Sequence, residues 1–182
     1  MYKYGKSFLL ANMLFFVTNI FFEVKYNLYT TNIQIDILLI ASCLFSAIGE
    51  EIIFRYFLQK LLINRFTHNT IHVIVITNVL FAISHSINIT TYATINYVII
   101  QIICAFSVGC YLSTIAVIDN SIIRCVLIHV FINITALGKQ KISYFGQIDI
   151  TREEGIAYLI VSIIYLCITY KIYKKQFRRL KR

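Results

Sequence analysis

Charged and helix-breaking residues are scarce in this sequence. Only 14% of its 182 residues are charged and none is proline, whereas 59% are hydrophobic and the mean hydropathy is +0.75. A water-soluble domain cannot hide that much apolar surface. Because about 20 apolar residues cross a bilayer, a chain of this length accommodates about six membrane helices with short loops. The composition therefore predicts an integral membrane protein.

Signatures of secreted and multidomain proteins are also missing. No glycine-rich or serine-rich linker, repeat or low-complexity tract divides the chain, which predicts a single integral membrane domain over residues 1–182. The N-terminal apolar stretch lacks a small-residue cleavage site, so we expect it to be retained as a helix. The cysteines have no spacing typical of a zinc ribbon or a disulfide framework, and we expect buried thiols at Cys43, Cys104, Cys110, Cys125 and Cys167.

Long apolar runs recur along the whole chain. Backbone amides cannot remain unpaired in hydrocarbon, so each run must form a helix or join a closed barrel, and unbroken runs without two-residue alternation exclude the barrel. The predicted fold class is all-α, a polytopic membrane helix bundle with about six transmembrane helices and the active site inside the bundle. The runs are residues 7–22, 35–63, 71–86, 95–118, 121–137 and 156–173.

Basic residues are concentrated at the C-terminus. Residues 171–182 hold seven of the 17 lysines and arginines and no acid. After an apolar run, such a tail favours a cytoplasmic flank facing anionic lipid headgroups over a segment that binds nucleic acid. The loop at 87–94 carries no charge, so the basic residues place both termini in the cytoplasm. Abundant Ile, Asn, Tyr and Lys favour a bacterial source, and we expect a multi-pass protein of a bacterial cell membrane.

Two carboxylates and a guanidinium interrupt the second run. Glu50, Glu51 and Arg55 lie among Ile, Leu and Phe, where each charge costs about 2.5–3.5 kcal/mol on insertion scales. Glu51 and Arg55 are four residues apart, so on a helix they share a face and can pair. Glu50 points about a quarter turn away, which leaves one carboxylate for chemistry. Ser42 and Ser46 precede it at four-residue steps, and ordinary helix packing is their favoured role.

Two later runs each carry a histidine. His85 lies near the end of the third run, and His129 shares a helical face with Asn133 in the fifth. A lone buried histidine is most often a packing residue. Together with the two carboxylates and Arg55, however, these histidines favour a functional site, because ionisable groups inside a membrane are functional by default.

Two hydrolytic chemistries fit this polar set. In the first, Glu50, His85 and His129 bind a divalent metal ion, with zinc as the expected ion, and leave a position open for water. In the second, Glu50 is the general base for a water held with His85, while His129 and Asn133 donate hydrogen bonds to the oxyanion. The soluble-protease signatures His-Glu-x-x-His and Gly-x-Ser-x-Gly are absent. The residues alone leave both chemistries open.

Three motifs follow one another on successive runs: Glu-Glu-x-x-x-Arg at 50–55, Phe-x-x-x-His at 81–85 and His-x-x-x-Asn at 129–133. In this order they resemble the CAAX protease and bacteriocin-processing family, which includes the type II CAAX prenyl endopeptidases. The resemblance covers residues 41–137 and implies an all-helical membrane bundle. It also implies a role for each site residue. Glu50 would be the principal catalytic carboxylate, with Glu51 and Arg55 as its supporting pair. His85 would be the partner of Glu50, and His129 with Asn133 would form the second half of the site.

The leading hypothesis is therefore an intramembrane endopeptidase. Its substrate would be a membrane-associated protein or peptide, of the bacteriocin, leader or pheromone-precursor type, because prenylated substrates are eukaryotic. The expected partners are this substrate and the lipid bilayer, without nucleic acid. The alternative is a bacteriocin self-immunity or binding protein that does not need proteolysis, and dependence on Glu50 distinguishes the two. A third interpretation is a small transporter, since intramembrane Glu, Arg and His can relay protons.

Overall fold

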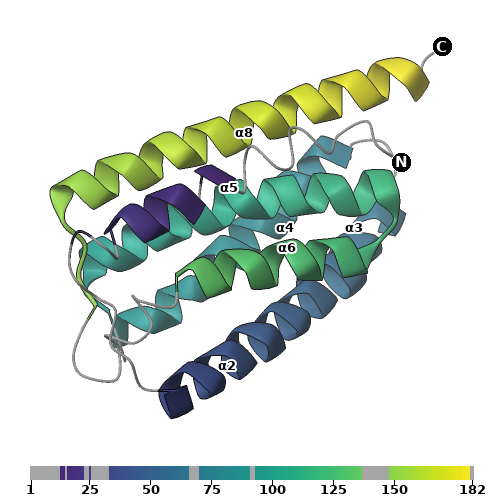
Figure 1. The fold of residues 1–182 in the computed structure, drawn as a ribbon. Helices are drawn as coiled ribbons and strands as arrows, with labels where there is room; N and C mark the ends of the chain where they lie inside the picture. The colour runs from purple at the N-terminus through teal and green to yellow at the C-terminus, as the bar shows by residue number, and fades with distance from the viewer. Residues whose placement is uncertain are drawn as a thin grey trace.

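The structure is a computed structural model, and it describes residues 13–14, 16–22, 25, 33–65, 70–90, 93–136 and 148–180. Within these ranges every regular element is helical, and the only sheet-like pairing is an isolated bridge between Ala93 and Ile148. Figure 1 shows the helices packed side by side as a bundle, with α8 along one side of α5 and α2 beside α6 at the opposite side. The predicted all-α membrane bundle is confirmed.

Five of the six predicted apolar runs form helices, and the first, 7–22, lies partly outside the described residues. Four helices of the described part are long and apolar enough to cross a membrane, and α6 is a shorter apolar helix. The elements are α2 (Ile33–Glu51), the π-helix η1 (Ile52–Gln59), α3 (Lys60–Arg65), α4 (Thr70–Ser84), the 3₁₀-helix η2 (His85–Thr90), α5 (Ile95–Asp119), α6 (Ile122–Thr135) and α8 (Arg152–Leu180).

Local signals set the ends of the two longest helices. Thr94 caps α5 by accepting a hydrogen bond from Tyr97 N at 3.4 Å, and Asn120 ends it in the left-handed region with φ 48°. Helix α8 begins with a capping box, in which Thr151 N donates to Glu154 Oε2 at 2.9 Å and Glu154 N donates to Thr151 Oγ1 at 3.3 Å. This box starts α8 before the apolar run that begins at 156.

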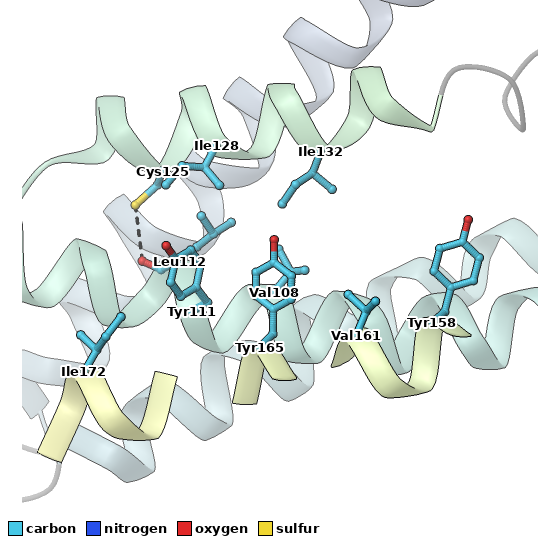
Figure 2. Close-up of a cluster of buried hydrophobic side chains, with 10 residues drawn as sticks. All are labelled: Val108, Tyr111, Leu112, Cys125, Ile128, Ile132, Tyr158, Val161, Tyr165 and Ile172. Carbon is cyan, nitrogen blue, oxygen red and sulfur yellow. Dashed lines mark hydrogen bonds between the residues drawn. The ribbon is translucent and has the colours of Figure 1, made fainter. Parts of the chain in front are cut away.

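The hydrophobic core lies where α5, α6 and α8 meet (Figure 2). Tyr111 of α5 and Tyr165 of α8 are fully buried and pack edge to face, with their ring centroids 5.4 Å apart. Cys125 of α6 is also fully buried, and its thiol donates to Leu112 O at 3.4 Å. Of the five free cysteines expected to be buried, Cys104 is half-buried and Cys167 is exposed. This core fixes α6, which carries one of the predicted site residues.

The bundle has polar side chains inside and apolar side chains outside. Along η1, Ile53 and Phe57 are 56% and 63% exposed, whereas Arg55 and Gln59 are buried. A water-soluble helix shows the opposite arrangement, but hydrocarbon solvates the outward apolar face and the bundle interior supplies partners for the polar groups. The distribution therefore matches a bundle embedded in lipid.

Candidate active site

The helix changes its winding at the two adjacent carboxylates. Helix α2 ends at Glu51 and the π-helix begins at the next residue, and π-helical segments are frequent at functional sites. Glu51 is fully buried, whereas the Glu50 side chain keeps 29% of its surface exposed. Ser46 donates from Oγ to Glu50 Oε1 at 2.6 Å, so Ser46 does more than the ordinary packing that we expected. The two neighbouring carboxylates occupy different environments.

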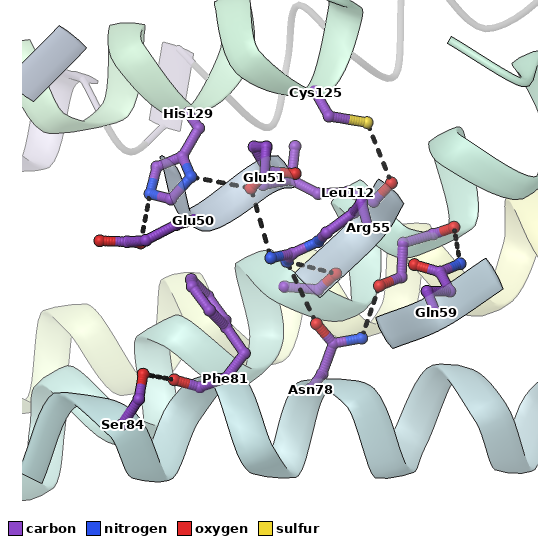
Figure 3. Close-up of polar contacts among 12 residues, drawn as sticks. Glu50, Glu51, Arg55, Gln59, Asn78, Phe81, Ser84, Leu112, Cys125 and His129 are labelled. Carbon is purple, nitrogen blue, oxygen red and sulfur yellow. Dashed lines mark hydrogen bonds and ion pairs between the residues drawn. The ribbon is translucent and has the colours of Figure 1, made fainter. Parts of the chain in front are cut away.

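Arg55 forms the ion pair with Glu51 that the spacing predicted. Its Nη1 lies 3.3 Å from Glu51 Oε1, and both side chains are buried. Its Nη2 donates to Asn78 Oδ1 at 3.2 Å and to Gly109 O at 3.3 Å. The guanidinium also lies over the Phe81 ring, 4.4 Å from the centroid (Figure 3), which adds a cation–π attraction. Helices α4 and α5 together compensate this buried charge.

Helix α5 approaches Arg55 closely because residue 109 is glycine. A Cβ on Gly109 would overlap Asn78 Oδ1 and would lie 3.0 Å from Phe81 Cδ1 and 3.1 Å from Arg55 Nη2. Asn78 is itself held in place, since its Nδ2 donates to Ser113 Oγ at 2.8 Å. Gly109 and Asn78 therefore determine where the guanidinium lies.

The imidazole of His129 lies between the two carboxylates (Figure 3). Nδ1 is 2.8 Å from Glu51 Oε1, and Nε2 is 3.6 Å from Glu50 Oε2. A ring that donates from Nδ1 to Glu51 has a fixed orientation and turns Nε2 toward Glu50. A separation of 3.6 Å is too long for a direct hydrogen bond, but a water can bridge it. Glu50 Oε2 is buried without a hydrogen-bond partner, which favours such a water.

A cavity of about 310 Å³ lies beside His129. His85, Asn88 and Asn133 also line its wall, so both predicted histidines face one space. The Phe81 ring packs edge to face against both, with centroids 5.0 Å from His85 and 5.9 Å from His129. His85 Nδ1 lies 3.0 Å from Phe81 O of the preceding helical turn. Its Nε2 is therefore the nitrogen left to act in the cavity.

Glu50 contacts a histidine of α6 directly. In the part of the chain that the structure describes, the polar contacts of Glu50 go to Ser46 and His129, and those of His85 go to Phe81. The reason is that α4 ends before His85, which begins the 3₁₀-helix η2, while α6 packs directly against α2 and η1. His129 is therefore the histidine that faces Glu50, and the water that was expected between Glu50 and His85 remains a prediction.

The possible metal ligands are not gathered. Among the described residues no group of three His, Cys, Asp or Glu side chains could hold a metal ion. His129 turns one nitrogen toward each carboxylate, and His85 turns Nδ1 toward a backbone carbonyl. In this arrangement Glu50, His85 and His129 do not fit a zinc ion, and the reaction proposed below uses none.

Sequence reasoning missed several buried groups of the site. Gln59 continues the four-residue spacing of Glu51 and Arg55, is 1% exposed, and donates from Nε2 to a backbone carbonyl of α5 at 3.0 Å. An amide at this spacing inside an apolar run could have been used to predict that Gln59 lies on the same buried face as Glu51 and Arg55. The contacts of Asn78 and Gly109 with Arg55 depend on how α4 and α5 pack, which local patterns do not indicate.

Comparison with known proteins identifies the family of this chain. A family model described as type II CAAX prenyl endopeptidase Rce1-like matches residues 32–135, which is more than half of the 182-residue chain. The match runs from α2 to α6 and includes every predicted site residue. It confirms the resemblance seen over residues 41–137. Neither the curated proteins nor the solved structures gave a match.

Proposed function

This chain belongs to the Rce1-like family of type II CAAX prenyl endopeptidases, and we propose that it hydrolyses a peptide bond with a water activated between Glu50 and His129. Family membership supports a CAAX-type intramembrane protease in general, and the four long apolar helices make it a membrane protein. One observation carries the finer proposal: His129 is held between two carboxylates beside a cavity.

Glu51 and Arg55 act as positioning residues in this proposal. Glu51 accepts the hydrogen bond that orients the imidazole of His129, and Arg55 compensates the negative charge that this requires inside the bundle. Like Glu50, neither side chain lines the cavity beside His129, but unlike Glu50 both are fully buried and pair with each other. Their effect on the reaction is therefore exerted through His129.

Glu50 and His129 would carry out the proton transfers. Glu50 Oε2 accepts a proton from a water held against His129 Nε2, and the water oxygen bonds to the carbonyl carbon of the substrate. The carbonyl oxygen becomes an oxyanion, to which the Asn133 amide can donate a hydrogen bond from the cavity wall. His85 Nε2 can donate to it as well when both ring nitrogens carry protons, because Nδ1 already donates to Phe81 O. When the C–N bond breaks, Glu50 returns the proton to the leaving nitrogen. The reaction consumes one water and leaves Glu50 ionised.

The cavity favours a peptide from the membrane as substrate. Its wall combines apolar side chains such as Val108 and Ile132 with the amides of Asn88 and Asn133. Apolar walls suit the side chains of a membrane-associated peptide, while a few amides can pair with its backbone. We therefore propose a membrane-associated protein or peptide as the substrate class.

The test is cleavage of a membrane-presented peptide library by purified protein in liposomes. Glu50→Gln should lower kcat by about 10²- to 10⁴-fold, the usual contribution of a general base. Glu153→Gln is the matched control, because Glu153 is exposed at the start of α8 and pairs with Lys25. Equal cleavage by wild type and Glu50→Gln would remove Glu50 from the mechanism. Loss of wild-type cleavage with a chelator would replace this mechanism with a metal-dependent one.

A further inference from the structure

Glu51, Arg55 and Gln59 follow one another at four-residue steps and form a buried polar stripe that begins near His129. A second cavity, of about 450 Å³, lies at the other end of this stripe. It opens between η1, α3 and the turn that joins α5 to α6, and no residue of its wall belongs to the first cavity. The α5 residues that line the first cavity lie between Tyr97 and Val108, whereas Ala116 and Val117 near the other end of α5 line the second. Polar residues are prominent in the second wall, namely Arg55, Gln59, Lys60, Asn64, Asn120 and Ser121.

A stripe of side chains with buried atoms that lack hydrogen-bond partners runs between the two cavities. These atoms are Glu50 Oε2, Glu51 Oε2, Arg55 Nη1, Arg55 Nε and Gln59 Oε1. They account for five of the eight such side-chain atoms in the described residues. Arg55 Nη1 still has an ion-pair contact with Glu51, and Glu50 Oε2 one with His129. Glu51 Oε2, Arg55 Nε and Gln59 Oε1 are therefore the atoms of this stripe that most need a partner. The stripe begins beside His129, which lines the first cavity, and ends at Gln59, which lines the second.

Water is the ligand whose chemistry matches the inner end of the second cavity. Arg55 Nε is a donor that needs an acceptor, whereas Gln59 Oε1 is an acceptor that needs a donor. An anion that carries no proton could accept from Arg55 but could not donate to Gln59. A water can do both, and a cavity of this size with these polar side chains in its wall has room for several.

We propose that the second cavity holds water and supplies it to the Glu50–His129 pair along the stripe of Glu51, Arg55 and Gln59. The supply step rests on the proposed function, because each cleaved peptide bond consumes one water. A peptide that fills the first cavity displaces the water there. A separate inlet at the opposite end of the bundle lets hydrolysis proceed while the substrate stays bound.

Thiol labelling tests whether the second cavity is wet. Ala116 lines it, so Ala116→Cys places a thiol there in a Cys167→Ser background that lacks the exposed native cysteine. A charged, water-soluble methanethiosulfonate reagent reacts with the thiolate, which forms in water and not in lipid. Ile163→Cys is the control, because Ile163 is 61% exposed on the apolar outer face of α8. We expect Ala116→Cys to react about tenfold faster than the control, and equal rates would overturn the proposal.

Filling the cavity tests whether its water is used in hydrolysis. Ala116→Phe should lower kcat by about tenfold and leave KM unchanged, because the first cavity is untouched. Ile163→Phe adds an aromatic ring on the lipid side and should behave as wild type. Ala116→Val, which occupies less space, should give an intermediate kcat and guards against misfolding of the phenylalanine variant. An unchanged kcat in both Ala116 variants would overturn the supply step.

The labelling experiment and the cleavage experiment together distinguish this inference from the proposed function. If wild-type protein cleaves no peptide, the proposed protease activity fails, and the labelling rates still decide whether the second cavity is wet. If cleavage depends on Glu50 but Ala116→Cys labels no faster than Ile163→Cys, the protease remains and the water inlet is wrong.

Discussion

His129 Nδ1 lies 2.8 Å from Glu51 Oε1, while the neighbouring carboxylate, Glu50, faces the other nitrogen of the same ring. Two consecutive residues thus approach one imidazole from two sides. Only Glu51 is paired with Arg55 and fully buried, so the charge of Glu51 is compensated inside the protein. Glu50 keeps part of its surface exposed. This asymmetry is the reason for proposing that Glu51 supports the structure and that Glu50 transfers protons.

Glu51→Gln should destabilise the protein strongly. The substitution leaves the buried Arg55 guanidinium without its ion-pair partner, and breaking a buried pair from one side costs about 3–5 kcal/mol. Thermal unfolding in detergent should show a large decrease in the unfolding temperature. Glu50→Gln should unfold close to wild type while losing cleavage. If both variants unfold at the wild-type temperature, the assignment of the two carboxylates is wrong.

Removing both members of the pair should recover part of the lost stability. In Glu51→Gln combined with Arg55→Met, no uncompensated charge remains in the bundle, so the double variant should unfold at a higher temperature than Glu51→Gln alone. Asn78 and Gly109 would still lose the donor that they accept from, so recovery should be incomplete. A double variant no more stable than Glu51→Gln would mean that the ion pair does not determine the loss.

His85 should act in catalysis without supporting the fold. Its ring lines the cavity and makes its hydrogen bond to Phe81 O, one helical turn earlier in the chain. His85→Ala should therefore lower kcat by about 10²- to 10³-fold, as removal of an oxyanion donor does, with little change in unfolding temperature. His72→Ala is the matched control, because His72 lies exposed on α4. If His85→Ala and His72→Ala have equal kcat values, His85 lines the cavity without taking part in the reaction.

The helices were predictable because the bilayer imposes them. Each apolar run had to satisfy its own backbone hydrogen bonds, so the run lengths alone indicated the spans. The start of α8 was not visible in hydropathy, because Arg152, Glu153 and Glu154 are polar and enter the helix through the capping box with Thr151. The predictions of cytoplasmic termini and a bacterial source remain predictions.

The sequence indicated which residues gather at the site, but not which of them contact one another across helices. Spacing along one helix indicated that Glu51 and Arg55 pair, since that contact is local. The choice between His85 and His129 as the partner of Glu50 depends on where α4 ends and how α6 packs, which are properties of the tertiary structure. The periodicity of a single helix contains no information on distances between side chains of different helices. The roles of all these residues in catalysis remain predictions.

Gly109→Ala tests whether the packing around Arg55 is as tight as the structure shows. The added methyl group would overlap Asn78 Oδ1 and lie 3.1 Å from Arg55 Nη2, so α5 must move away or Arg55 must lose its partners. Overpacking of this kind costs about 1–3 kcal/mol, although alanine favours a helix by about 0.8–1.0 kcal/mol over glycine. Thermal unfolding in detergent should therefore show a net loss of stability, and cleavage should fall as His129 and Glu51 shift.

Gly49→Ala is the matched control, because a Cβ there meets nothing within 4 Å. The helix preference of alanine should leave this variant as stable as wild type or more stable. Equal behaviour of the two alanine variants would show that α5 has room at residue 109, and that Gly109 does not position the guanidinium.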